Sequence, residues 1–218
     1  MEAGQQGVIL LHGLARTRRS MRPLAACLRR QGYAVVNVGY PSRRHPIETL
    51  AREALPAAIA TLRQQGVTAI HFVTPSMGGI LLRAYLAEES LPGLGRVVML
   101  SPPNQGSELV DLLGRYSWFR FIFGPAGCQL GTDPNSLPNR LGPARFPLGI
   151  ITGNRPAIGL AHFIPGPSDG KVAVARAQLE GMADFLVLPY GHALIMVHRE
   201  VHEQVIHFLR TGGFRRAV

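Results

Sequence analysis

The feature that most constrains the fold of this chain is a serine at the junction between a strand and a helix. The apolar run of residues 69–73 ends just before Ser76, and Gly78 and Gly79 open a segment compatible with a helix. A turn this sharp raises the serine hydroxyl above the edge of a sheet and aims the next backbone amide, that of Met77, at a developing oxyanion. The pattern therefore indicates acyl-transfer chemistry on Ser76.

The motif is imperfect, because Thr74 stands where the pattern G-x-S-x-G has its first glycine. A serine before two glycines also occurs in ordinary turns. Support comes from residues 7–11, an apolar strand that leads into His12-Gly13, where a loop can offer the amide of Leu14 to the same oxyanion. His12 belongs to the strand end, so we expect it to shape this loop through backbone hydrogen bonds rather than to act as a base.

Turn and cap residues divide the chain into alternating strands and helices. Strands are predicted at residues 8–11, 33–38, 69–73, 96–100, 148–152 and 185–188, and helices at about 20–31, 46–65, 80–89 and 199–209. Between residues 104 and 145 the periodicity fails, and Gly, Pro, Ser and aromatic residues accumulate. This alternation predicts an α/β fold, with a mostly parallel, doubly wound sheet of about six strands and helices on both faces.

These motifs together resemble the α/β-hydrolase superfamily, and in particular bacterial lipases and esterases of the triacylglycerol-lipase type. The resemblance is carried by residues 12–14, 76–79, 102–107, 168–172 and 191–192, which occur in the family's order. In that family the catalytic residues follow the order Ser, Asp or Glu, His. The resemblance implies a triad of Ser76, Asp169 and His192. Family members usually carry His at the position of Pro75, so the chain departs from the family there.

The turn sequence around Asp169 follows the strand at 148–152, where a sheet presents loops at its carboxyl edge. Taken alone, Asp169 reads as a turn residue that bonds its own backbone; the strand and histidine downstream favour a catalytic acid. The alternatives are Asp111 and Asp133, which precede the required strand, and Asp184, which lies at the wrong end of the next one.

His192 follows the strand at 185–188 after a short turn, a placement from which a base can reach a serine on a neighbouring strand end. His198, His202 and His207 fall on or beside the final helix and show no complete metal motif. In the resulting mechanism His192 is the base and Asp169 orients it, while the amides of Leu14 and Met77 hold the oxyanion. Neither a cofactor nor a metal is required.

The segment 109–128 is unusually aromatic for a solvated loop. In the resembled family this insertion, here about 104–145, holds a lid or the wall of an acyl site. We therefore expect Trp118, Phe121 and Phe123 to bind substrate, most simply an ester with a hydrophobic acyl chain. The alternative is that these rings only cover the sheet.

The chain has 218 residues, of which 46% are hydrophobic and 17% charged, consistent with one domain over residues 1–218. The formal net charge of +10 comes almost entirely from arginine, with Lys171 as the only lysine. Four arginines follow the loop expected to bind the oxyanion and are suited to attract an anionic lipid surface or an acidic ester: Arg16, Arg18, Arg19 and Arg22. No nucleic-acid motif accompanies the charge.

The sequence has no apolar run long enough to span a membrane and no signal-peptide pattern, so we expect a soluble, cytoplasmic protein. Two function classes follow. The first is a serine hydrolase of carboxylic esters, or an acyltransferase that uses the same triad. The second is a hydrolase-fold protein that has lost catalysis and binds lipid-like ligands, which Thr74 and Pro75 would favour. The oligomeric state is not encoded in any motif.

Overall fold

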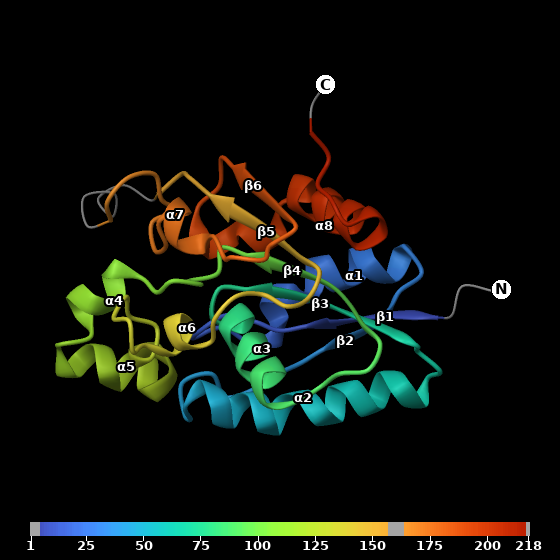
Figure 1. Cartoon of the computed structure of the whole chain (residues 1–218), viewed down its shortest axis with the longest axis horizontal. Helices are drawn as coiled ribbons and strands as arrows, with labels where there is room; N and C mark the ends of the chain where they lie inside the picture. The colour runs from blue at the N-terminus through green and yellow to red at the C-terminus, as the bar shows by residue number, and fades with distance from the viewer. Residues whose placement is uncertain (1–4, 157–163, 217–218) are drawn as a thin grey trace.

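The computed structural model describes residues 5–156 and 164–216 (Figure 1). Its centre is a six-stranded sheet in the order β2-β1-β3-β4-β5-β6, in which every neighbouring pair is parallel. The strands are β1 (Gln6–Leu10), β2 (Ala34–Asn37), β3 (Ala69–Pro75), β4 (Leu94–Leu100), β5 (Leu148–Gly153) and β6 (Asp184–Leu188). The predicted fold class, including the number of strands, is confirmed.

Helices cover both faces of the sheet. The four longest that pack on it are α1 (Arg22–Arg30), α2 (Ile47–Gln64), α3 (Met77–Glu88) and α8 (Arg199–Thr211). In Figure 1, α1 and α8 lie on one side of the strands and α2 and α3 on the other. Neighbouring parallel strands need such helices as crossover connections. After each strand, the chain must run back to the end of the sheet at which the next strand begins.

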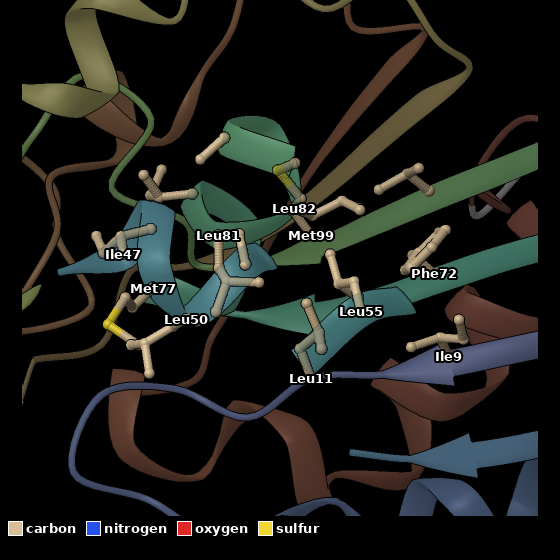
Figure 2. Close-up of a cluster of buried hydrophobic side chains, with 14 of the residues drawn as sticks. Ile9, Leu11, Ile47, Leu50, Leu55, Phe72, Met77, Leu81, Leu82 and Met99 are labelled. Atoms are coloured by element: carbon tan, nitrogen blue, oxygen red, sulfur yellow. The ribbon is translucent and has the colours of Figure 1, made fainter. Parts of the chain in front are cut away.

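The central strands are buried on both sides, the edge strands β2 and β6 only in part, and alternate residues face different cores. Ile9, Phe72 and Met99 point toward α2 and α3, where Figure 2 shows them gathered with Leu50 and other apolar side chains. The residues between them, such as Val8 and Val98, pack against α1 and α8. Because a one-residue slip would exchange the two cores, this pattern fixes the strand register.

The segment from 104 to 145, where the periodicity of the sequence fails, contains three short helices: α4 (Glu108–Leu113), α5 (Ser117–Cys128) and α6 (Leu137–Arg140). In Figure 1, α4 and α5 lie beside one end of the sheet. The chain kinks inside α5 at Gly124, which has φ 65°, and Pro125 follows. These breaks explain why no long apolar repeat is visible in the sequence.

The remaining elements are the short α7 (Val174–Ala177) and two 3₁₀ turns, η1 (Arg18–Met21) and η3 (His192–Val197). No helix within the described residues has the length and apolar character that crossing a bilayer requires.

Candidate active site

Ser76 occupies a strained turn between β3 and α3. Its backbone has φ 52° and ψ −128°, a conformation that costs a non-glycine residue free energy and that surrounding structure must maintain. Part of that support is a hydrogen bond from the Ser76 amide to the Leu100 carbonyl at 2.8 Å. Pro75, the residue that departs from the family pattern, is the last residue of β3, where a missing amide donor is tolerated.

Small residues allow the turn to approach its neighbours. A Cβ added to Gly78 would lie 3.0 Å from the His12 carbonyl oxygen, and one added to Gly13 would lie 3.4 Å from the Ser76 Cβ. Thr74 fits into this arrangement, because its Cβ would be 3.5 Å from that of a residue at position 78. The glycine missing from the motif is therefore not needed for the helix to pack on the strand.

The three residues proposed as a triad form a continuous chain of hydrogen bonds. His192 Nε2 lies 3.0 Å from Ser76 Oγ, and His192 Nδ1 lies 2.7 Å from Asp169 Oδ2. The other carboxylate oxygen, Oδ1, accepts the backbone amides of Lys171 and Val172 at 2.9 and 2.8 Å. A carboxylate only accepts hydrogen bonds, so Nδ1 of a neutral His192 carries the proton and Nε2 is free to accept one from Ser76.

Burial and hydrogen bonding act in opposite directions on Asp169, which is only 2% exposed. Burial acts to raise its pKa, but the charge and hydrogen bond of His192 and the Val172 amide lower it more, and the net pKa lies below its ordinary value. Asp169 is thus held ionised beside the imidazole.

The loop after β1 is held by His12, whose ring is fully buried. Its Nδ1 donates to the Gly13 carbonyl at 2.9 Å, and its Nε2 accepts the Tyr40 amide at 3.3 Å. The Tyr40 ring stacks on the imidazole, with centroids 4.0 Å apart, and its hydroxyl donates to the His12 carbonyl. Burial lowers the pKa of His12 and keeps it neutral. His12 therefore shapes the loop through the backbone, as its position predicts.

Tyr40 is a supporting residue that the sequence interpretation missed. It follows β2, the strand that pairs with β1, and so reaches the end of β1 where His12 lies. Its position in the sequence could have indicated this role. Tyr40 lies just after β2, and consecutive strands in an alternating α/β pattern usually pair, so the end of β2 is expected beside the end of β1.

The alternative acids serve other contacts. The carboxylate of Asp111 accepts the amide and hydroxyl of Thr132 at 2.9 and 2.6 Å. Asp133 accepts the amide of Asn135, which makes it a turn residue. Asp184 binds the C-terminal segment through the Phe214 amide and the Arg216 guanidinium, both at 2.6 Å. None of these bonds involves His192.

A cavity of about 160 Å³ opens beside Ser76 and His192. Apart from these two residues, its lining is largely apolar and comes mainly from the loop after β1, from α4 and α5, and from the segment after His192. The apolar lining includes Leu14, Leu109, Val110, Leu113, Phe119, Phe123, Leu130 and Met196. A cavity of this composition beside a serine and histidine in contact is typical of a site for an apolar substrate.

The aromatic residues of α5 divide between its two faces. Phe123 lines the cavity and packs on Phe119, with ring centroids 4.7 Å apart. Trp118 and Phe121 are not among the lining residues that the structure describes, and Phe121 is 91% exposed. Phe119, which is 4% exposed and lines the cavity, was not singled out from the sequence. The sequence could have indicated it, because Phe119 lies four residues before Phe123 and residues four apart share one face of a helix.

The all-parallel six-stranded sheet with helices on both faces has the α/β-hydrolase fold. No family model matches the sequence, and no curated protein matches it. Among solved structures, the mature form of lipase BlEst2 from Bacillus licheniformis superposes with a TM-score of 0.68 at 20% identity, over 96% of this chain and 93% of that one.

Two further structures extend the comparison. The monoacylglycerol lipase of Paleococcus ferrophilus has a TM-score of 0.63 at 17% identity and covers 96% of this chain and 98% of its own. Phospholipase PlaB from Legionella pneumophila has a TM-score of 0.65 at 20% identity over 96% of this chain, which spans 57% of the PlaB chain. The chain therefore has the α/β-hydrolase fold and resembles bacterial and archaeal lipases and esterases over nearly its whole length.

Proposed function

We propose that the chain is a serine hydrolase that cleaves carboxylic esters through an acyl-enzyme on Ser76. The observation that carries this proposal is the chain of hydrogen bonds from Ser76 through His192 to Asp169 at the wall of an apolar cavity. A serine hydroxyl is a weak nucleophile until an oriented base removes its proton, and this geometry supplies both the base and the group that orients it.

In the proposed mechanism His192 Nε2 takes the proton of Ser76 as Oγ attacks the ester carbonyl carbon. The amides of Leu14 and Met77 stabilise the oxyanion, and Asp169 stabilises the imidazolium. The C–O bond then breaks as His192 returns the proton to the leaving alcohol. Water, deprotonated by the same histidine, releases the carboxylic acid from Ser76.

We infer that the acyl chain occupies the cavity and that the insertion at 104–145 forms its wall within a single domain. Phe123, together with Phe119, is assigned to the bound acyl chain. Trp118 and Phe121, on the outer face of α5, are assigned to the approach of a lipid substrate or lipid surface. Contact of apolar rings with an acyl chain is favourable in proportion to the apolar area removed from water.

An alkyl fluorophosphonate tests the proposal, because it reacts with an activated serine and remains bound. The intact mass should increase by one adduct, and peptide mapping should place the adduct on Ser76. The matched control is Ser76→Ala, which should stay unlabelled while its circular dichroism matches the wild type. Folded wild-type protein that forms no adduct and releases no acid from any ester would instead support a ligand-binding protein. Acyl transfer to added glycerol in place of water would identify an acyltransferase.

A further inference from the structure

Two cationic side chains line this largely apolar cavity. Arg16 and Lys171 both line it, and both are exposed. The Arg16 guanidinium donates to the Ala193 carbonyl at 3.2 Å, which leaves most of its donors free. The backbone of Lys171 is also held in place, because its carbonyl accepts a hydrogen bond from the Ser107 hydroxyl at 2.6 Å.

Neither cation is paired with a carboxylate within residues 5–156 and 164–216. The carboxylate closest in sequence, Asp169, is already bound by His192 and two backbone amides. The Lys171 side chain as a whole is exposed, but burial of its ammonium group lowers its pKa. The nearby charge of Arg16 lowers this pKa further, and the charge of Asp169 acts to raise it. Two like charges near each other, neither in an ion pair with a carboxylate, favour an anionic ligand.

The position of the two cations shows which part of an ester they would meet. Arg16 bonds the residue after His192, and Lys171 lies two residues after Asp169. Both also line the cavity that contains His192, the residue that returns a proton to the leaving alcohol in the proposed mechanism. The rings of Phe119 and Phe123 line the same cavity and are assigned above to the acyl chain, so the two cations are available to the alcohol portion. A second hollow of about 230 Å³, lined by Lys171, His192 and His198 among others, adjoins the histidine and offers room for the alcohol portion.

We propose that the substrate is an ester of an apolar carboxylic acid with an alcohol that carries a phosphate group, and that Arg16 and Lys171 bind this phosphate. The inference rests on the proposed ester hydrolase. A phosphate monoester carries close to two negative charges near neutral pH, which matches two cations, and arginine binds its oxygens in a bidentate manner. Hydrolysis leaves the phosphate unchanged: water supplies OH to the acyl group, and the alcohol oxygen receives a proton from His192.

The test compares two esters that differ only in the phosphate, monooctanoylglycerol and monooctanoylglycerol phosphate. Both are used as monomers, below their aggregation concentrations, so that attraction to a charged lipid surface cannot contribute. The ratio of their kcat/KM values should favour the phosphate ester by at least about tenfold in the wild type, as expected for charge-assisted hydrogen bonds. A glycerol monoester of octanedioic acid, with its charge at the far end of the acyl chain, should gain no such advantage.

The ratio should fall several-fold in Arg16→Met and in Lys171→Met and approach one in the double variant, with partial recovery in Lys171→Arg. The matched control is Arg19→Met, which removes the same charge from an exposed arginine outside the cavity and should keep the wild-type ratio. Because each protein is its own reference, partial loss of folding lowers both rates and leaves the ratio intact.

Several outcomes overturn this inference. They are a wild-type ratio near one, a ratio insensitive to both substitutions, and an equal fall in Arg19→Met, which would mean general electrostatic attraction. Hydrolysis of the neutral ester with no preference for phosphate refutes the inference alone. Failure to hydrolyse either ester, in a protein whose Ser76 still reacts with the fluorophosphonate, also refutes the inference alone. Failure to hydrolyse any ester together with no adduct on Ser76 refutes the proposed function and the inference with it.

Discussion

The Ser76 turn and the α4–α5 segment border the same cavity but are built in different ways. The turn joins a central strand to a helix, its neighbours are buried, and its backbone is bonded across the sheet. The α4–α5 segment consists of short helices with a kink at Gly124 and exposed rings on its outer face. The comparison teaches that the sheet core holds the hydroxyl of the proposed nucleophile, while the opposite wall of the cavity depends on few buried contacts and is open to variation.

The largest effect is expected at the triad. Ser76→Ala and His192→Ala should each lower kcat on a p-nitrophenyl ester by roughly 10⁴ to 10⁶, and the double variant should be little worse because the residues act as a unit. Asp169→Asn should cost somewhat less. Melting temperatures close to that of the wild type would show that chemistry and not folding is lost. An active Asp169→Asn combined with an inactive Asp184→Asn would mean that the acid has been misassigned.

A smaller loss should follow when only the fit of the Ser76 turn is disturbed. The Cβ of Gly78→Ala would press on the His12 carbonyl oxygen at 3.0 Å, so the oxyanion loop must shift. A contact at 3.0 Å requires the neighbouring backbone to shift by only a few tenths of an ångström. Because a displacement on the order of 1 Å in a reacting group can cost about 10² in rate, kcat should fall by more than about tenfold but less than about 10², with KM little changed.

Gly79→Ala is the matched control for Gly78→Ala. Its Cβ would meet the Met99 Sδ, also at 3.0 Å, but a methionine side chain can move aside where backbone cannot. Steady-state kinetics of the two variants should therefore differ clearly. Equal activity in both would show that the close approach of α3 to the oxyanion loop has no bearing on the chemistry.

The smallest effect is expected from substitutions on α5, where the two faces of the helix should respond differently. Phe123→Ala should lower kcat/KM for a long-chain ester by about tenfold and change the acetate ester little, because it removes apolar area only from the longer acyl chain. Phe121→Ala, the same substitution on the exposed face, should leave monomeric esters unaffected. If both variants lose activity equally at every chain length and melt earlier, the helix serves stability and not the acyl site.

The sheet could be predicted from sequence because each strand is an apolar run bounded by turn residues. The same logic placed Ser76, Asp169 and His192 after β3, β5 and β6 of a parallel sheet, whose carboxyl ends share one edge. Their hydrogen-bond distances could not be predicted in this way.

What sequence could not supply are contacts set by tertiary geometry. Tyr40 reaches His12 across 28 residues only because β1 and β2 pair in parallel. The rotation of α5, which turns Phe119 and Phe123 inward and Phe121 outward, depends on how a kinked helix docks, and single residues do not encode that.

Asp169 is held by hydrogen bonds to both its backbone and its side chain. The Asp169 amide donates to the Val172 carbonyl at 3.2 Å, while its carboxylate accepts the Val172 amide. The Asp169 carbonyl accepts the His192 amide at 2.9 Å, while its carboxylate accepts the His192 ring. Asp169 and His192 are thus held to each other through backbone and side chain alike. A substitution in α4 or α5, on the other wall of the cavity, can therefore change what binds beside Ser76 while these bonds stay in place.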